Sequence, residues 1–261
     1  MGIKIYIRST KSQETQETLH YMVECFIIYK KMIVGSFMKS LKEYIYEVLL
    51  DEGLLDRVKN KEVNHEAIIK EFLKDNYDIN GSYIVKETKN GFIVDIDGYV
   101  DVKNKKIISF TNEFFKFGVV SGSFYCIDCK SLKTLEGAPE RVDGNFNCGW
   151  CDSLTSLEGA PKEVGGDFYC GYCDSLKTLE GAPKEVGENF SCEHCKSLKT
   201  LEGTPKEVGR SFNCKGCDSL KTLKGAPKRV GGIFYCGNCG VKFTENDVRK
   251  YTTPEFISTS I

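Results

Sequence analysis

The stretch FYCGYCDSLKTLEGAPKEVGEN, residues 168–189, decides the fold of this chain, because close copies of it follow one another from residue 122 to residue 243. The shared pattern is F-x-C-x-x-C-x-S-L-x-x-L-E-G-A-P-x-x-V-G-x-x, with a period of 22 residues. Six copies carry the cysteine pair, and the sixth departs from the pattern after its second cysteine. A constant period of this length is typical of a stacked array in which each unit contacts its neighbours.

Each copy predicts one short strand. In F-x-C the phenylalanine and the first cysteine lie two positions apart, so both side chains point to the core face of a strand. The G-A-P corner turns the chain, and the valine brings the return segment back to the core. We therefore expect an α+β protein: a parallel β-solenoid with one short strand per coil, a mostly irregular convex side and an N-terminal helical and β cap. The predicted core columns are Phe124, Phe146, Phe168, Phe190, Phe212 and Phe234, with Leu132, Leu154, Leu176, Leu198 and Leu220.

The residues before the array divide into three predicted segments. Residues 1–37 form a poorly defined extension, and the clear pattern that begins at Met38 is the basis of a hypothesis that the natural protein starts there. Residues 38–80 form a helical segment, with an amphipathic helix after Met38 and a second helix over His65–Asn76. Residues 81–121 hold a β hairpin and a degenerate capping coil.

The hairpin is predicted from strand-like residues over Ser82–Glu87 and Gly91–Val102, joined by a turn at Lys89-Asn90-Gly91. The coil after it lacks the cysteines, as expected of an atypical unit that covers the open end of an array. Its core positions are expected at Ile107, Ile108, Phe110 and Phe117.

The opposite end of the array, residues 244–261, is predicted to be a cap helix and a tail. Thr244 is followed three residues later by Asp247, which is typical of a capped helix start. The expected helix runs over Glu245–Tyr251.

The array accounts for twelve of the thirteen cysteines, and Cys25 in the extension is interpreted as a free thiol. The favoured interpretation is a buried ladder without a cofactor, in which the second thiol of each pair donates to a carbonyl of a neighbouring coil. A structural zinc array is the alternative, because C-x2-C-x18-C-x2-C falls within four-thiolate spacing. The near identity of all six copies argues against zinc sharing between pairs, and a redox enzyme is least favoured because these pairs follow strands. The ligands in the zinc alternative are Cys126, Cys129, Cys148, Cys151, Cys170, Cys173, Cys192, Cys195, Cys214, Cys217, Cys236 and Cys239.

Partner binding is expected where residues vary while the frame stays constant. Tyrosine, tryptophan and asparagine are enriched there, as on many recognition surfaces. Trp150 is the single tryptophan and the first anchor candidate, while His194 fits a surface histidine better than a zinc ligand because no other copy has one. The competing interpretation is that these residues are merely tolerated on a surface. The candidates are Tyr125, Asn147, Trp150, Tyr169, Tyr172, His194, Asn213 and Tyr235.

The phrase F-x-C-x-x-C resembles the strand and turn of the leucine-rich repeat, where L-x-L is the strand and Asn or Cys closes the turn. The longer phrase SLEGAPKEVGGDFYC, residues 156–170, is similar to leucine-rich-repeat-like proteins often encoded by large tailed phages. The resemblance departs from the standard pattern at the repeat start, where Gly165 stands in place of leucine, and at Leu176, which comes one residue late. It implies a solenoid of leucine-rich-repeat type that serves as a recognition scaffold, with no particular ligand.

Composition narrows the classes of function. The chain has 36 basic and 37 acidic residues, which argues against nucleic acid or an anionic membrane as a partner. Residues 1–20 lack the apolar core of a secretory signal, so we expect a reducing cytoplasm, the host-cell cytoplasm if the protein is viral. No nucleophile, phosphate-loop or metalloenzyme motif is present. We expect a non-enzymatic scaffold that recognises an unidentified protein; the alternatives are a zinc-binding array and an enzyme with an unrecognised site in residues 38–120.

Overall fold

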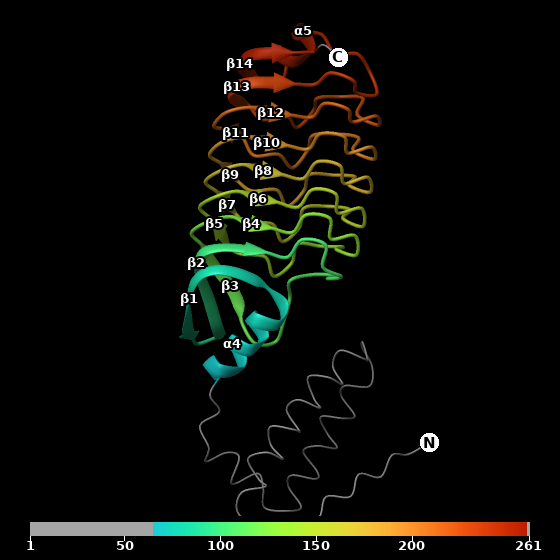
Figure 1. Ribbon diagram of the computed structural model, residues 1–261. Coiled ribbons are helices and arrows are strands. Elements are labelled where there is room, and N and C mark those ends of the chain that lie inside the picture. The colour runs from blue at the N-terminus through green and yellow to red at the C-terminus, as the bar shows by residue number, and fades with distance from the viewer. Residues whose placement is uncertain (1–64, 260–261) are drawn as a thin grey trace, which may run out of the picture. The chain divides into compact units, whose positions relative to one another are not determined.

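In the computed structural model, which describes residues 65–259, the chain winds into a stack of coils with strands aligned along it (Figure 1). The predicted extension 1–37 and the helix after Met38 lie outside the described residues. The coils pair in parallel and in register, with Phe124 beside Phe146 and Phe168 beside Phe190. The predicted parallel β-solenoid is therefore confirmed.

Two columns of short strands run along the stack, where one was predicted. The first begins each repeat: β4 (Phe124–Tyr125), β6 (Phe146–Asn147), β8 (Phe168–Tyr169), β10 (Phe190–Ser191) and β12 (Phe212–Asn213). The second lies on the return segment: β3 (Lys116–Val120), β5 (Arg141–Val142), β7 (Glu163–Val164), β9 (Glu185–Val186) and β11 (Glu207–Val208). The longer β13 (Arg229–Tyr235) joins both columns in the last coil. Because the valine segments stack at the same rise as the phenylalanine strands, they also form backbone ladders.

The N-terminal end of the stack is covered by a helix and a hairpin. The helix α4 (His65–Asn76) has the predicted bounds and buries Ile69 and Leu73. The strands β1 (Asp78–Thr88) and β2 (Gly91–Asp101) pair antiparallel along their whole length. β2 also pairs in parallel with β3 and β4, so it starts both columns. The hairpin prediction is confirmed, and its first strand begins four residues before the expected Ser82.

The coil between β2 and β4 replaces repeat residues with aromatic ones. Phe110 and Phe117 are buried and Ile107 packs against the core, as predicted. Ile108 is 54% exposed, so its predicted core position is wrong: its carbonyl accepts from the Lys133 N–H at 3.0 Å and its side chain faces solvent. Phe115, which the prediction omitted, is buried and packs edge-on against Phe117 at 5.0 Å.

The core consists of columns of identical side chains. The six repeat phenylalanines are fully buried. The centroids of neighbouring rings lie 5.1–5.5 Å apart, and the ring planes are nearly parallel. The leucine column from Leu132 to Leu220 is equally buried. Each ring thus gains stacking contacts from its neighbours in addition to its removal from water, so stability is shared between coils.

A column of short polar side chains lies next to the phenylalanine column, because each polar residue directly precedes a repeat phenylalanine in the sequence. Hydrogen bonds along this column fix the register of the coils. The Asn145 N–H donates to Ser123 Oγ at 3.0 Å, and the Asp167 N–H donates to Asn145 Oδ1 at 2.8 Å. The same bond recurs from the N–H of Asn189 to Asp167 Oδ1 at 2.9 Å and from the N–H of Ser211 to Asn189 Oδ1 at 3.0 Å. These bonds satisfy backbone donors beside the strands.

The C-terminal end is closed by α5 (Glu245–Arg249) and β14 (Thr253–Ser258). Thr244 and Asp247 form the predicted capping box, although the helix ends two residues before Tyr251. The expected tail is instead a strand that pairs in parallel with β13. β14 therefore adds one more layer to both columns.

Candidate functional site

The second residue between each pair of cysteines adopts a left-handed backbone. Its φ is 58° at Asp128, 59° at Trp150 and Tyr172, 54° at His194, 69° at Gly216 and 53° at Asn238. The tight corner is held by the next coil, because the N–H at this position donates to a carbonyl there, as from Trp150 to Gly171 at 3.0 Å. This backbone costs about 1–2 kcal/mol for an ordinary L-residue and less for Gly, Asn or Asp. Asp128, Gly216 and Asn238, which adopt this backbone at a lower free-energy cost, lie at the ends of the column. The aromatic residues lie in the middle.

The three middle side chains stack into an aromatic ladder, defined as Trp150, Tyr172 and His194. The ring centroids of Trp150 and Tyr172 lie 4.8 Å apart at an interplanar angle of 3°, and those of Tyr172 and His194 lie 4.7 Å apart at 20°. The rise of one coil, about 4.8 Å, matches the spacing at which rings stack. Trp150 remains 40% exposed, so the ladder presents ring edges and one large indole to solvent.

Tyr169 extends the ladder onto the strand face. Its ring lies 5.7 Å from Trp150 and covers two glycines, Gly149 and Gly171. A Cβ on Gly149 would lie 2.6 Å from Tyr169 Cε1, and one on Gly171 would lie 2.8 Å from the hydroxyl. The Tyr169 ring can therefore lie over Gly149 and Gly171 only because neither residue has a side chain.

Glu193 is a site residue that sequence reasoning missed. The Tyr169 hydroxyl donates to Glu193 Oε1 at 3.0 Å, and Asn213 Nδ2 donates to Oε2 at 2.9 Å. Burial, and then the Glu193 charge, raise the pKa of Tyr169, so its hydroxyl keeps the proton that it donates. The available signal was that Glu193 is the one acid at the first position inside the six cysteine pairs.

The remaining candidates lie beside the ladder or away from it. Tyr125, Asn147 and Tyr169 line one shallow hollow of about 180 Å³ on the strand face. Tyr125 also packs edge-on against Tyr99 at 6.4 Å. Tyr235 lies in β13, beside the C-terminal cap. Tyr125 thus lies beside the N-terminal hairpin and Tyr235 beside the C-terminal cap, while the other candidates lie in the coils between them.

The cysteines form two columns rather than metal clusters. Each second thiol donates to a carbonyl of the preceding coil, as predicted; Cys151 reaches the Cys126 carbonyl at 3.1 Å and Cys173 reaches the Cys148 carbonyl at 3.2 Å. Burial raises the pKa of the first-column thiols Cys126 and Cys148, which disfavours thiolate. In the described part of the chain, no group of three or more His, Cys, Asp or Glu side chains is placed to hold a metal ion. This arrangement does not fit a four-thiolate zinc site.

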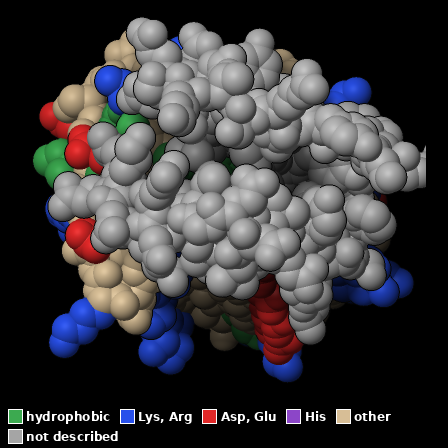
Figure 2. Space-filling model, turned by 90° about the horizontal axis from the view of Figure 1, so that it is seen from below, with side chains coloured by type: hydrophobic (Ala, Val, Ile, Leu, Met, Phe, Trp, Pro, Cys, Tyr) green, Lys and Arg blue, Asp and Glu red, His purple; other side chains and the backbone are tan. Residues whose placement is uncertain are grey.

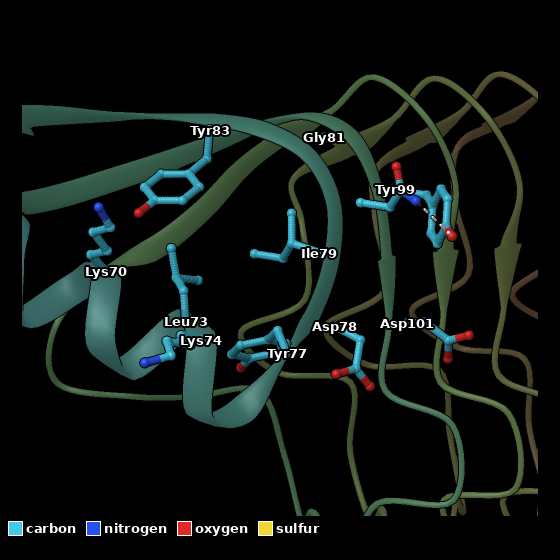
Figure 3. Close-up of a pocket in the computed structure, with 11 residues that line it drawn as sticks. Lys70, Leu73, Lys74, Tyr77, Asp78, Ile79, Gly81, Tyr83, Tyr99 and Asp101 are labelled. Atoms are coloured by element: carbon cyan, nitrogen blue, oxygen red, sulfur yellow. Dashed lines mark hydrogen bonds between the residues drawn. The ribbon is translucent and has the colours of Figure 1, made fainter.

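A second hollow, of about 640 Å³, lies between α4 and the hairpin (Figure 3). Lys70 and Lys74 extend from α4 along one side, while Asp78 and Asp101 lie on the other. The acids form ion pairs with lysines outside the lining, at 3.4 and 3.1 Å. No histidine or cysteine is among the described residues that line it.

None of the protein-family models, curated proteins or solved structures compared with the chain matches it. Neither helix of residues 65–259 has the length and apolar character that crossing a membrane requires. The repeat architecture and the ladder geometry are therefore the observations from which function is inferred.

Proposed function

We propose that the protein is a non-enzymatic scaffold that recognises a partner protein, with the aromatic ladder as its anchor. The observation that supports this proposal is the placement of three bulky rings at left-handed backbone positions, stacked in register and open to solvent on one side. Strained backbone that neighbouring coils hold in place is typical of functional sites.

The chemistry of the ladder suits a protein surface. Tryptophan and tyrosine bury much apolar area at a small entropic cost, and rings fixed by stacking lose still less freedom on binding. Charges near the ladder are neutralised locally: Lys130 pairs with Asp128 at 2.7 Å and with Asp152 at 3.0 Å. In the view along the stack, lysine, arginine and acidic side chains all project around the rim (Figure 2). This mixture favours a partner with polar and apolar groups over a polyanion.

The test compares binding by the wild-type protein and by Trp150→Ala. Proteins cross-linked to the wild type in a lysate of its native host are identified, and the affinity of the purified partner is measured for both. We expect the variant to bind about thirtyfold more weakly, as for an anchor residue. Its free energy of unfolding should change by no more than about 1.5 kcal/mol.

Tyr251→Ala is the matched control, because Tyr251 is a 41% exposed aromatic residue in the C-terminal cap, against 40% for Trp150. It should leave partner affinity unchanged. Equal affinity of the wild type and Trp150→Ala would contradict the proposal.

We further propose that the solenoid is of leucine-rich-repeat type, of the kind encoded by large tailed phages. The second cysteine of each pair supports this type, because its thiol bonds to the preceding coil from the turn position that carries Asn or Cys in such repeats. Cys173→Asn should accordingly fold. A reducing cytoplasm, that of the host cell for a phage protein, agrees with the free state of the described cysteines.

A further inference from the structure

Cys239 ends the second column of thiols on the C-terminal side. It is half-buried, whereas the other eleven described cysteines are buried. The cause is the break in the repeat: Gly240 to Phe243 replace the leucine phrase, so no complete coil follows. Solvent therefore reaches this thiol and not its equivalents in the coils below.

Cys214, in the preceding coil, faces Cys239. The Cys239 thiol donates to the Cys214 carbonyl at 3.2 Å. Burial, and then a hydrogen bond with the Cys239 thiol, raise the pKa of Cys214, so Cys214 keeps its proton until it reacts. Hydrogen bonds from the Cys214 thiol and from the N–H groups of Cys217 and Gly216 lower the pKa of Cys239. A lower pKa increases the fraction of thiolate, the form that reacts.

The same arrangement occurs one coil lower without access to solvent. The Cys217 thiol donates to the Cys192 carbonyl at 3.2 Å. Burial, and then a hydrogen bond with the Cys217 thiol, raise the pKa of Cys192 in the same way. Both residues are buried. The chain thus contains its own control, a pair of like geometry that differs in exposure.

We propose that Cys239 and Cys214 form a redox-active pair that small peroxides such as hydrogen peroxide oxidise to a disulfide. The Cys239 thiolate attacks one peroxide oxygen, the O–O bond breaks, and the hydroxide that leaves takes a proton to become water. The Cys214 sulfur then attacks the sulfenic sulfur of Cys239, and the second hydroxide leaves with the Cys214 proton as water. Two thiols lose two electrons and two protons, and one peroxide becomes two waters.

The disulfide joins the last coil to the coil before it. It closes a segment with a sequence separation of 25 residues that contains the whole of β13. Closure of this segment restricts fraying where the stack ends. Oxidation should therefore protect the segment between Cys214 and Cys239 from proteolysis, and reduction should reverse that protection.

The test uses the full-length protein, reduced and then exposed briefly to iodoacetamide in its folded state, with each cysteine read by peptide mass mapping. Cys239 should be alkylated several times faster than any other described cysteine, and mapping reads Cys25 separately. A second sample is titrated with hydrogen peroxide, blocked with N-ethylmaleimide and digested without reductant. A Cys214–Cys239 linked peptide, lighter by two hydrogens and cleaved by dithiothreitol, should appear before any other link.

Two variants separate this pair from general oxidation. Cys239→Ser should abolish the link, and Cys217→Ser should leave it intact. Equal alkylation of Cys239 and Cys217, or a Cys192–Cys217 link that forms as early, would overturn the proposal. Mapping of the wild-type protein decides the outcome even where a variant fails to fold.

Discussion

The return segment and the cysteine turn of each coil differ in how their exposed residues vary along the stack. On the return segment, Glu163, Glu185 and Glu207 stack directly above one another with their charges alike. At the cysteine turn, the residue at the same backbone position changes from coil to coil and becomes aromatic in the middle. Like charges in register destabilise a sheet, whereas stacked rings stabilise it.

Opposite charges at the two ends of the return column offset part of the repulsion between the stacked glutamates. Arg229 stands where the pattern has glutamate and forms an ion pair with Glu207, and Glu140 stands where it has lysine and pairs with Lys162 at 2.8 Å. The return side is thus a repeated solvent-facing surface, neutralised at its ends. Variation inside a constant frame, rather than repetition, therefore distinguishes the surface that we propose as the binding site from the return side.

The largest effect is expected where the two sides share one core. Leu176 is fully buried, so Leu176→Ala should destabilise the protein by about 2–5 kcal/mol through lost burial and a cavity. Urea unfolding followed by circular dichroism measures the change. Lys177→Ala, at the exposed neighbouring position, should lie within about 0.5 kcal/mol of the wild type. A small effect at Leu176 would show that the coils do not share the core described here.

A smaller effect is expected from coupling within the ladder. Trp150→Ala and Tyr172→Ala, alone and together, should give a coupling energy of about 0.5–1.5 kcal/mol in a double-mutant cycle of unfolding free energies. Trp150→Ala combined with Tyr251→Ala should be additive, because Tyr251 follows α5 at the far end of the stack. If Trp150→Ala and Tyr172→Ala were additive as well, the contact between the two rings would not contribute to the free energy of unfolding.

The smallest effect is expected on the return side. Glu185→Gln should stabilise the protein by a few tenths of a kcal/mol at low salt, because it removes repulsion from Glu163 and Glu207. The gain should vanish in about 1 M salt, where charges are screened within about 3 Å. Arg229→Gln is the matched change of opposite sign, since it removes an attraction to Glu207. Thermal melts at two salt concentrations measure both, and a salt-independent gain at Glu185 would rule out repulsion as the cause.

Much of the fold could be predicted because the determining signals are local or periodic. The 22-residue period sets the stack, the apolar spacing sets α4, and Thr244 with Asp247 sets the start of α5. The return strands were missed because a two-residue strand such as Glu163–Val164 has no period of its own. Ile108 was misplaced because its orientation depends on a hydrogen bond to the next coil.

The candidate site was predicted in composition but not in arrangement. Trp150, Tyr172 and His194 stand out as variable residues, but their stacking follows from a left-handed turn that the pattern does not reveal. Glu193 was missed because its role is to accept from Tyr169 and Asn213, two residues in different coils. Contacts between coils are what the sequence pattern leaves unspecified.

The in-register phenylalanine column makes the length of this protein adjustable. Because every coil offers its neighbour the same ring, strand and polar acceptor, a duplicated 22-residue segment inserted between Asn189 and Phe190 meets matching surfaces above and below. Unequal recombination within such a gene would add or delete whole coils without redesigning either terminus. An added copy with an aromatic residue at its corner would lengthen the ladder by one ring, so the proposed binding surface can grow in discrete steps.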